Sequence, residues 1–315
     1  MKAPIFTIAD SSVYIPDSRI RVEEIIHELS GIGIAMRQNA EECRENGFEQ
    51  LPLEQSYSLE QMIVSVCAPL LIRARQEGTR IAAILFFCVT NSGIKAEELF
   101  AGLLQEFVPE APPVLQMEEY GCASFHLSLH LAKAFFAGTA RDDEAILFVT
   151  ADKARNARER SDTFMLFGDA ASAALYRKPA SGGQQVLAGG LKADGIAYDG
   201  SPEQIKMYFS TFYLSVRQVV NQVMREAGVG VTELSLVFCT NLGLDTWRIL
   251  AKVLGFPIQL FYADTLGTAG HLHNTDILLN VTDAVRRGKL RRGDIYLAIT
   301  VGFGGYYGCS LHQYE

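Results

Sequence analysis

Cys122 has the surroundings of a reactive thiol. It lies in residues 119–125 (EYGCASF), where an extended apolar stretch gives way to a long helical pattern. Backbone N–H groups and the helix dipole at the start of a helix favour a thiolate over a thiol. A free cysteine is more often a buried, space-filling residue, so the position alone does not identify a nucleophile. Thiol chemistry also needs a base or a cationic partner.

A glycine-punctuated loop, residues 266–276 (LGTAGHLHNTD), contains candidates for that base. It follows an expected strand and leads into an expected helix, and loops of this kind commonly carry site residues. Asp276 follows His271 closely enough to orient its imidazole, as a carboxylate does in Ser-His-Asp chemistry. The alternative is a helix cap with incidental histidines, and the sequence assigns no role to His273.

Residues 302–305 (GFGG) form a third candidate element. A tight glycine turn can point backbone N–H groups at a developing oxyanion. The N–H group of Cys122, at the start of its helix, could be the second donor. The alternative is a β-bulge or a strand kink, for which glycine is also used.

No metal site or cofactor is expected. His126 and His130 share one helix face, but no glutamate follows His126 in an HExxH arrangement, and a polar stripe on a partly buried helix is favoured. The absence of CxxC spacing argues against a zinc site and a disulfide framework, and predicts reduced thiols in a cytoplasmic protein. The six cysteines are Cys43, Cys67, Cys88, Cys122, Cys239 and Cys309.

The composition predicts a globular enzyme with a large core, since 49% of the 315 residues are hydrophobic and 20% are charged. A net charge of −8 without a basic run argues against binding to nucleic acid or to an anionic membrane. No apolar run reaches the ~20 residues that span a bilayer, and the first residues do not form a signal peptide.

Apolar strand-like runs alternate with helical patterns, and several runs are continuous, which predicts an α/β protein whose sheet is covered on both faces. The linker 178–185 (KPASGGQQ) separates two halves, 1–178 and 186–315, which look alike in outline and suggest an internal duplication. Strands are expected at 5–8, 82–89, 145–150, 171–176, 236–240, 259–262, 295–301 and 307–312. Helices are expected at 58–76, 95–107, 122–137, 204–227, 245–255 and 275–287.

Four segments resemble, in order, those of the thiolase superfamily, and most closely the ketoacyl-ACP synthase III-like enzymes. They are residues 121–125 (GCASF), 167–173 (FGDAASA), 287–294 (RGKLRRGD) and 302–305 (GFGG). The resemblance implies a five-layer αβαβα fold of two like halves, the first carrying the nucleophile and the second the histidine and glycine loops. It also implies a homodimer, with the segment 89–91 as the candidate loop across the interface.

The resemblance implies acyl transfer. Cys122 would take an acyl group from a thioester on an acyl carrier protein or on CoA, and the acyl-enzyme would then meet a small-molecule acceptor. Usual members of the family have a histidine where this chain has Thr240 and an asparagine where it has Gly270-His271. A divergent branch resembles this pattern better: acyltransferases of antibiotic pathways and condensing enzymes of quinolone-type pathways.

By this resemblance His271 would be the base and Asp276 would orient it. Asn241 would hydrogen-bond the thioester carbonyl, and the amides of Cys122 and Gly304 would form the oxyanion hole. The loss of the usual His and Asn puts malonyl decarboxylation in doubt.

The expected function is therefore acyl transfer in secondary metabolism, with formation of a C–C, ester or amide bond. The alternative is a catalytically silent partner subunit of a heteromeric complex. Trp247 is the only tryptophan and does not match the family's adenine clamp, which favours a carrier-protein donor. Four phenylalanines could line an acyl tunnel, but packing in the core is the favoured interpretation. These are Phe86, Phe87, Phe209 and Phe212.

Overall fold

The computed structural model describes residues 3–90, 95–117, 120–138, 140–162, 164–195 and 201–315. In this part of the chain, nine strands form one mixed sheet in the order β5-β4-β6-β7-β1-β8-β11-β10-β9, and β2 pairs with β3 in a separate ribbon. The strands are β1 (Phe6–Tyr14), β2 (Arg19–Arg21), β3 (Gln50–Pro52), β4 (Arg80–Phe87), β5 (Val114–Met117), β6 (Glu144–Asp152), β7 (Ala170–Arg177), β8 (Gln184–Ala193), β9 (Leu234–Cys239), β10 (Ile295–Gly302) and β11 (Tyr306–Tyr314).

The two halves of the sheet repeat one pattern. In the first, β4 runs parallel to β6, and β7 and β1 follow as antiparallel neighbours. In the second, β9 runs parallel to β10, and β11 and β8 follow in the same way. The halves meet where β1 pairs with β8. Counted outward from this junction, the strands β1, β7, β6 and β4 correspond to β8, β11, β10 and β9, and β5 extends the first half beyond β4.

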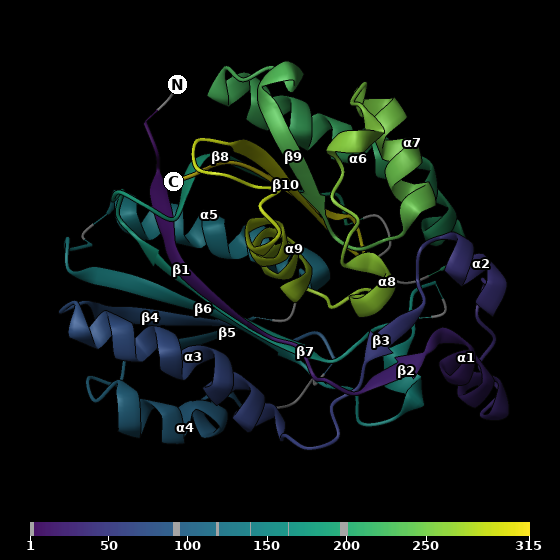
Figure 1. The fold of residues 1–315 in the computed structure, drawn as a ribbon, viewed down its shortest axis with the longest axis horizontal. Helices are drawn as coiled ribbons and strands as arrows, with labels where there is room; N and C mark the ends of the chain where they lie inside the picture. The colour runs from purple at the N-terminus through teal and green to yellow at the C-terminus, as the bar shows by residue number, and fades with distance from the viewer. Residues whose placement is uncertain (1–2, 91–94, 118–119, 139, 163, 196–200) are drawn as a thin grey trace.

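Helices separate and cover the two halves of the sheet in five layers (Figure 1). The outer helix α3 packs on β1, β6 and β7, while α6 packs on β8 and β11 on the opposite outer side. Between the halves lie α5, which contacts β8 and β11, and α9, which contacts β1, β7 and β9. This arrangement confirms the expected αβαβα fold. The helices are α1 (Val22–Gly31), α2 (Ala40–Glu45), α3 (Leu59–Gln76), α4 (Ala96–Phe107), α5 (Ser124–Ala137), α6 (Pro202–Ala227), α7 (Leu244–Leu254), α8 (Leu266–Ala269) and α9 (Thr275–Arg286).

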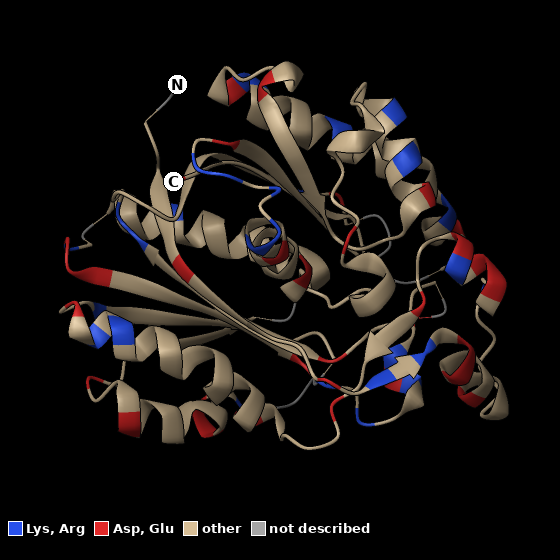
Figure 2. Ribbon diagram, in the orientation of Figure 1, with Lys and Arg blue, Asp and Glu red and all other residues tan. Residues whose placement is uncertain are grey.

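Local sequence signals fix the ends of the outer helices. The Ser58 hydroxyl accepts a hydrogen bond from the Gln61 amide at the start of α3, in a capping box. Helix α6 begins with Pro202 and ends at Gly228, whose φ of 69° is the left-handed conformation that favours glycine. Charged residues lie mainly on the outer helices and the turns (Figure 2). Among the described residues, no helix combines the length and the apolar character that crossing a bilayer demands.

Two expectations about the sheet differ from the structure. Residues 259–262 are not a strand: Ile258–Leu260 is a 3₁₀ turn, and Phe261 makes an isolated bridge to Val237. Conversely, β8 begins inside the expected linker, at Gln184. This strand has a polar, glycine-rich sequence, but its polar groups are paired in the core. The hydroxyl of Tyr296 donates to Gln184 Oε1 over 2.5 Å, for example.

Candidate active site

Cys122 lies in a 3₁₀ turn, Gly121–Ala123, that leads directly into α5. Its side chain is half-buried. The C-terminal end of β10 packs against this turn, and a Cβ atom at Gly302 would lie 2.3 Å from the carbonyl oxygen of Tyr120. Glycine at position 302 is therefore what allows β10 to approach the turn that carries the thiol.

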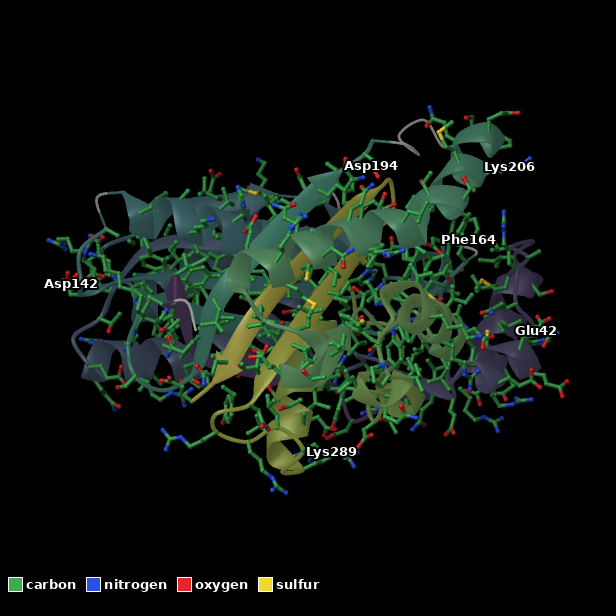
Figure 3. The ribbon with its side chains drawn as sticks, turned by 90° about the horizontal axis from the view of Figure 1, so that it is seen from above. Glu42, Asp142, Phe164, Asp194, Lys206 and Lys289 are labelled. Atoms are coloured by element: carbon green, nitrogen blue, oxygen red, sulfur yellow. The ribbon has the colours of Figure 1, made fainter. Side chains whose placement is uncertain are left out.

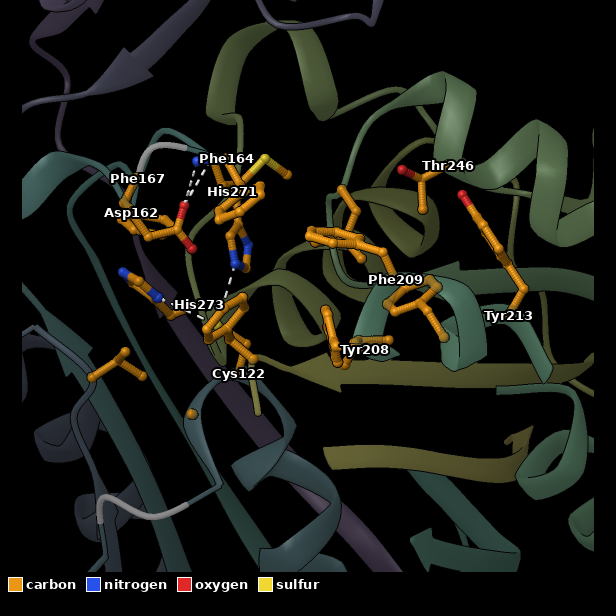
Figure 4. A pocket seen from close by; sticks show the side chains of 17 residues that line it. Cys122, Asp162, Phe164, Phe167, Tyr208, Phe209, Tyr213, Thr246, His271 and His273 are labelled. Carbon is orange, nitrogen blue, oxygen red and sulfur yellow. Dashed lines mark hydrogen bonds between the residues drawn. The ribbon is translucent and has the colours of Figure 1, made fainter. Parts of the chain in front are cut away.

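Hydrogen bonds connect Cys122 with His271, and His271 with Asp276. Figure 4 shows Cys122 beside the two histidines of the loop, His271 and His273. The Cys122 Sγ atom lies 3.2 Å from His271 Nε2, and His271 Nδ1 lies 2.6 Å from Asp276 Oδ2. The carboxylate of Asp276 also accepts the backbone amides of Asn241 and Leu272, each over 2.8 Å. Asp276 is thus fixed at the start of α9, and it fixes the imidazole of His271 in turn.

His273 is a second histidine beside the thiol. Its Nδ1 atom lies 3.4 Å from Cys122 Sγ, and its φ of 53° is a left-handed conformation that residues other than glycine seldom adopt. The ring of Phe167 packs against it, with the ring centroids 4.4 Å apart. His273 is 1% exposed, so its position beside the thiol is held from several sides.

The two imidazoles control the charge on the thiol. Burial disfavours the thiolate, but the nearby rings of His271 and His273 outweigh burial and lower the pKa of Cys122 to about 7. Burial also disfavours the imidazolium, yet Asp276 and Cys122 raise the pKa of His271 above its usual value. Burial lowers the pKa of His273 as well, but Asp152 and Cys122 outweigh burial and raise this pKa. The two histidines therefore favour the thiolate of Cys122, and a pKa of about 7 makes the thiolate available at neutral pH.

The loop that carries the histidines is tied to the first half of the molecule at two places. Asn274 joins it to the nucleophile turn, because its side-chain oxygen accepts the Phe125 amide over 3.1 Å and its nitrogen donates to the Gly121 carbonyl over 3.0 Å. The amide of Gly168 donates to the carbonyl of His271 over 3.0 Å. Asn274 was not among the candidates from the sequence, although it lies within the loop that was singled out.

Asn241 differs from its expected role. It is fully buried behind the histidine loop, where its side-chain nitrogen donates to the Gly270 carbonyl over 2.7 Å. Its side-chain oxygen accepts a hydrogen bond from Asn280 over 3.0 Å. This amide therefore has its partners in the histidine loop and in α9 and does not line the cavity.

The glycine turn lies against the turn that carries the nucleophile. Gly304 faces the ring of Tyr306. The backbone nitrogen of Phe303 is the amide near the nucleophile turn, since it lies 4.0 Å from the position that a Cβ atom on Gly121 would occupy. The turn 302–305 therefore approaches the nucleophile turn through Gly302 and Phe303.

His126 and His130 are not brought together as a metal site. Both ring nitrogens of His126 have partners, Thr300 Oγ1 at 2.6 Å and Ser310 Oγ at 2.9 Å, whereas His130 is exposed on the surface of α5. Burial lowers the pKa of His126 to about 3. This histidine is accordingly a neutral core residue.

A cavity of about 390 Å³ opens in front of Cys122. Phe209 and Phe212 contribute to its mostly apolar wall, whereas Phe86 and Phe87 are buried in the core. Phe164 also lines the cavity. Figure 3 shows Phe164 at the same end of the molecule as Glu42, with Asp142 at the other end. Val89 also lines the cavity, and Asn91 of the candidate interface loop lies outside the described residues.

Two further residues noted in the sequence are structural. Trp247 is 2% exposed and its indole N–H donates to the Thr240 carbonyl over 3.2 Å. The hydroxyl of Thr240 accepts the Val301 amide over 3.2 Å. Neither side chain lines the cavity.

Two family models match the chain. The model described as 3-oxoacyl-[acyl-carrier-protein] synthase III matches residues 118–195, and that of the C-terminal part of the same enzyme matches residues 224–314. Together they cover more than half of the chain.

Relatives and solved structures agree with these matches. The β-ketoacyl-[acyl-carrier-protein] synthase III of Aquifex aeolicus is 26% identical over 204 residues, 61% of this chain and 64% of that protein, so the match spans slightly less than two thirds of the relative's length. The solved structure of 3-oxoacyl-[acyl-carrier-protein] synthase III from Aquifex aeolicus VF5 has a TM-score of 0.78 at 18% identity and covers 98% of this chain and 100% of its own. The structure of ChlB3, named an acyltransferase, has a TM-score of 0.82 at 18% identity, with 98% and 97% covered. The chain therefore belongs to the ketoacyl-ACP synthase III-like condensing enzymes of the thiolase superfamily.

Proposed function

We propose that this protein is an acyltransferase that works through an acyl-enzyme on Cys122. The observation that carries the proposal is the hydrogen-bonded series of Cys122, His271 and Asp276 at the head of an apolar cavity. This is the arrangement of nucleophile, base and orienting carboxylate that covalent acyl transfer requires.

In the first half-reaction the Cys122 thiolate attacks the carbonyl carbon of an acyl thioester. The tetrahedral intermediate carries its negative charge on oxygen, which the amide of Cys122 and an amide of the turn 302–305 would stabilise. Its collapse breaks the C–S bond of the donor, and the leaving thiolate takes the proton from Nε2 of the His271 imidazolium.

In the second half-reaction, His271 Nε2 removes a proton from the acceptor as the acceptor attacks the acyl carbon. Cys122 leaves as a thiolate, so the site returns to its starting charge. Asp276 keeps the Nδ1 proton of His271 in place throughout, which leaves Nε2 free for both transfers.

The surroundings favour particular substrates. The cavity wall is mostly apolar and rich in aromatic rings, which suits an apolar acyl group or an aromatic acceptor. Buried Trp247 cannot stack on an adenine ring, and we expect a donor on an acyl carrier protein and a role in secondary metabolism. A homodimer is expected from the family. Threonine at position 240, where usual members have histidine, puts malonyl decarboxylation in doubt.

Intact-protein mass spectrometry after incubation with acyl-carrier-protein and acyl-CoA thioesters tests the proposal. We expect a mass increase equal to the acyl group in the native chain and in Cys43→Ala, and none in Cys122→Ala. Cys43 is a matched control, because it lies in α2 and does not line the cavity. If no donor gives an adduct with folded protein, the transferase proposal fails and the silent-partner interpretation replaces it.

A further inference from the structure

The side chains of Cys122, His271 and His273 converge as a set of three metal ligands. Among the described residues they are the one group of this kind, and a ligand atom of each lies within 4.8 Å of those of the other two. Cysteine sulfur and histidine nitrogen are the donors that zinc prefers in proteins. The sequence gives no sign of this grouping, because the thiol and the histidines lie about 150 positions apart.

The spacing fits a tetrahedral ion. With Zn–S bonds near 2.3 Å and Zn–N bonds of 2.0–2.1 Å, sulfur and nitrogen are roughly 3.5 Å apart around the metal. The observed separations from Cys122 Sγ are 3.2 Å to His271 Nε2 and 3.4 Å to His273 Nδ1. The two sulfur–nitrogen separations would therefore need to grow by only a few tenths of an ångström, and the two histidine nitrogens already lie within 4.8 Å of each other.

The surroundings support the same ligand set. Metal-bound histidines usually donate their other ring N–H to a carboxylate, which fixes the ring, and His271 Nδ1 has this partner in Asp276. His273 is fixed by its left-handed backbone and by the Phe167 ring. All three side chains line the cavity, so a fourth position would remain open to water or to a ligand.

We propose that Cys122, His271 and His273 bind one Zn²⁺ ion and that bound zinc blocks acylation of Cys122. Coordination takes the thiolate and the unprotonated nitrogens, and the displaced protons pass to solvent. Zinc would draw electron density from the sulfur that attacks the thioester and would occupy the Nε2 atom of His271 that transfers the proton, so we expect the two states to exclude each other. Zinc binding itself does not depend on acyl transfer, whereas the mutual exclusion rests on the proposed function.

Cobalt and zinc titrations of the full chain test this inference. We expect one Co²⁺ per chain with a thiolate-to-cobalt charge-transfer absorption, which is lost in Cys122→Ser. We expect His273→Gln to weaken Zn²⁺ binding at least about 10-fold, in competition with a chromophoric chelator. His130→Gln is the matched control, since His130 is an exposed histidine of α5, and should leave binding unchanged.

Alkylation of Cys122 in the presence of zinc tests the zinc site separately from the proposed acyltransferase function. Bound Zn²⁺ should prevent alkylation of Cys122 by iodoacetamide, and a chelator should restore it. A charge-transfer band that survives in Cys122→Ser, or zinc affinity that is unchanged in folded His273→Gln, would overturn the site. Equal rates of acylation with and without bound zinc would overturn only the proposal that zinc blocks acylation. A missing acyl adduct in metal-free protein would count against the proposed acyltransferase function and not against the zinc site.

Discussion

Asp276 holds His271 through a 2.6 Å hydrogen bond to Nδ1, while two backbone amides bind the same carboxylate. The carboxylate is completely buried and has no freedom to turn away. Its negative charge is one of the main reasons that the pKa of His271 is raised. Orientation and charge at His271 therefore both come from this one side chain.

Asp276→Asn should slow acylation of Cys122. Loss of the carboxylate lowers the pKa of His271 and permits the wrong tautomer, so less imidazolium stabilises the thiolate. We expect the acylation rate to fall on the order of 10²-fold, followed by stopped-flow or quenched mass spectrometry. An unchanged rate in a folded variant would show that His271 does not need its carboxylate.

Alkylation of Cys122 by iodoacetamide should depend on pH with a midpoint near the pKa of about 7. Because the thiolate is the reactive form, the rate rises with pH and levels off above the midpoint. In His271→Gln the midpoint should move upward, since the cation that favours the thiolate is gone. A native midpoint near 9, the ordinary value for this thiol, would contradict the thiolate–imidazolium assignment.

Asn241→Ala should destabilise the protein and impair the site together. The change leaves the Gly270 carbonyl and the Asn280 side chain without their bonds to residue 241, and the free energy of unfolding should fall by about 2 kcal/mol. Urea unfolding measures this loss. Asn221→Ala, on the exposed face of α6, serves as the control and should differ little from the native chain.

Gly302→Ala should lower the acylation rate in a protein that still folds. The added Cβ would meet the Tyr120 carbonyl at 2.3 Å, so the turn that carries Cys122 must move. A displacement of about 1 Å at a reacting group can cost on the order of 10²-fold in rate. Gly31→Ala, at an exposed position with open space around it, should have no such effect.

Acid should destabilise the protein through its buried neutral histidines. Burial lowers the pKa of His126 and of His312 to about 3, from 6.5. Between these values the unfolded chain binds more protons than the folded one, so stability is full above about pH 6.5 and declines as the pH falls. Urea unfolding from pH 7.5 to 5 should show this slope, and His312→Phe, which retains the ring stack on Tyr296, should reduce it.

The periodic elements and the reactive groups could be predicted from the sequence. Long apolar strands such as β6 and amphipathic helices such as α9 carry their signal locally. The loop with His271 and the turn with Cys122 could each be recognised from glycine and residue type. Strand β8 could not, because its buried glutamines are stabilised by partners such as Thr7, which lies 178 positions away.

The detailed roles needed three-dimensional contacts. Asn241 looked like a substrate contact because its neighbours resemble a family segment, but tertiary packing turns its amide toward Gly270 and Asn280. His273 was left without a role because only the fold brings it to 3.4 Å from a sulfur atom 151 positions away. Residue type predicted the chemistry available, and packing decided which atoms meet.

Because the two halves of the sheet repeat one pattern, the proposed catalytic residues are distributed over two similar halves of the chain. Each half supplies the N-terminal end of one central helix: α5 follows the thiol, and α9 begins beside His271 and Asp276. A chain cut between β7 and β8, in residues 178–183, would leave the nucleophile on one fragment and its base on the other. We expect neither fragment alone to be acylated. If acylation returned when the fragments were mixed, the two halves would have reassembled through the pairing of β1 with β8.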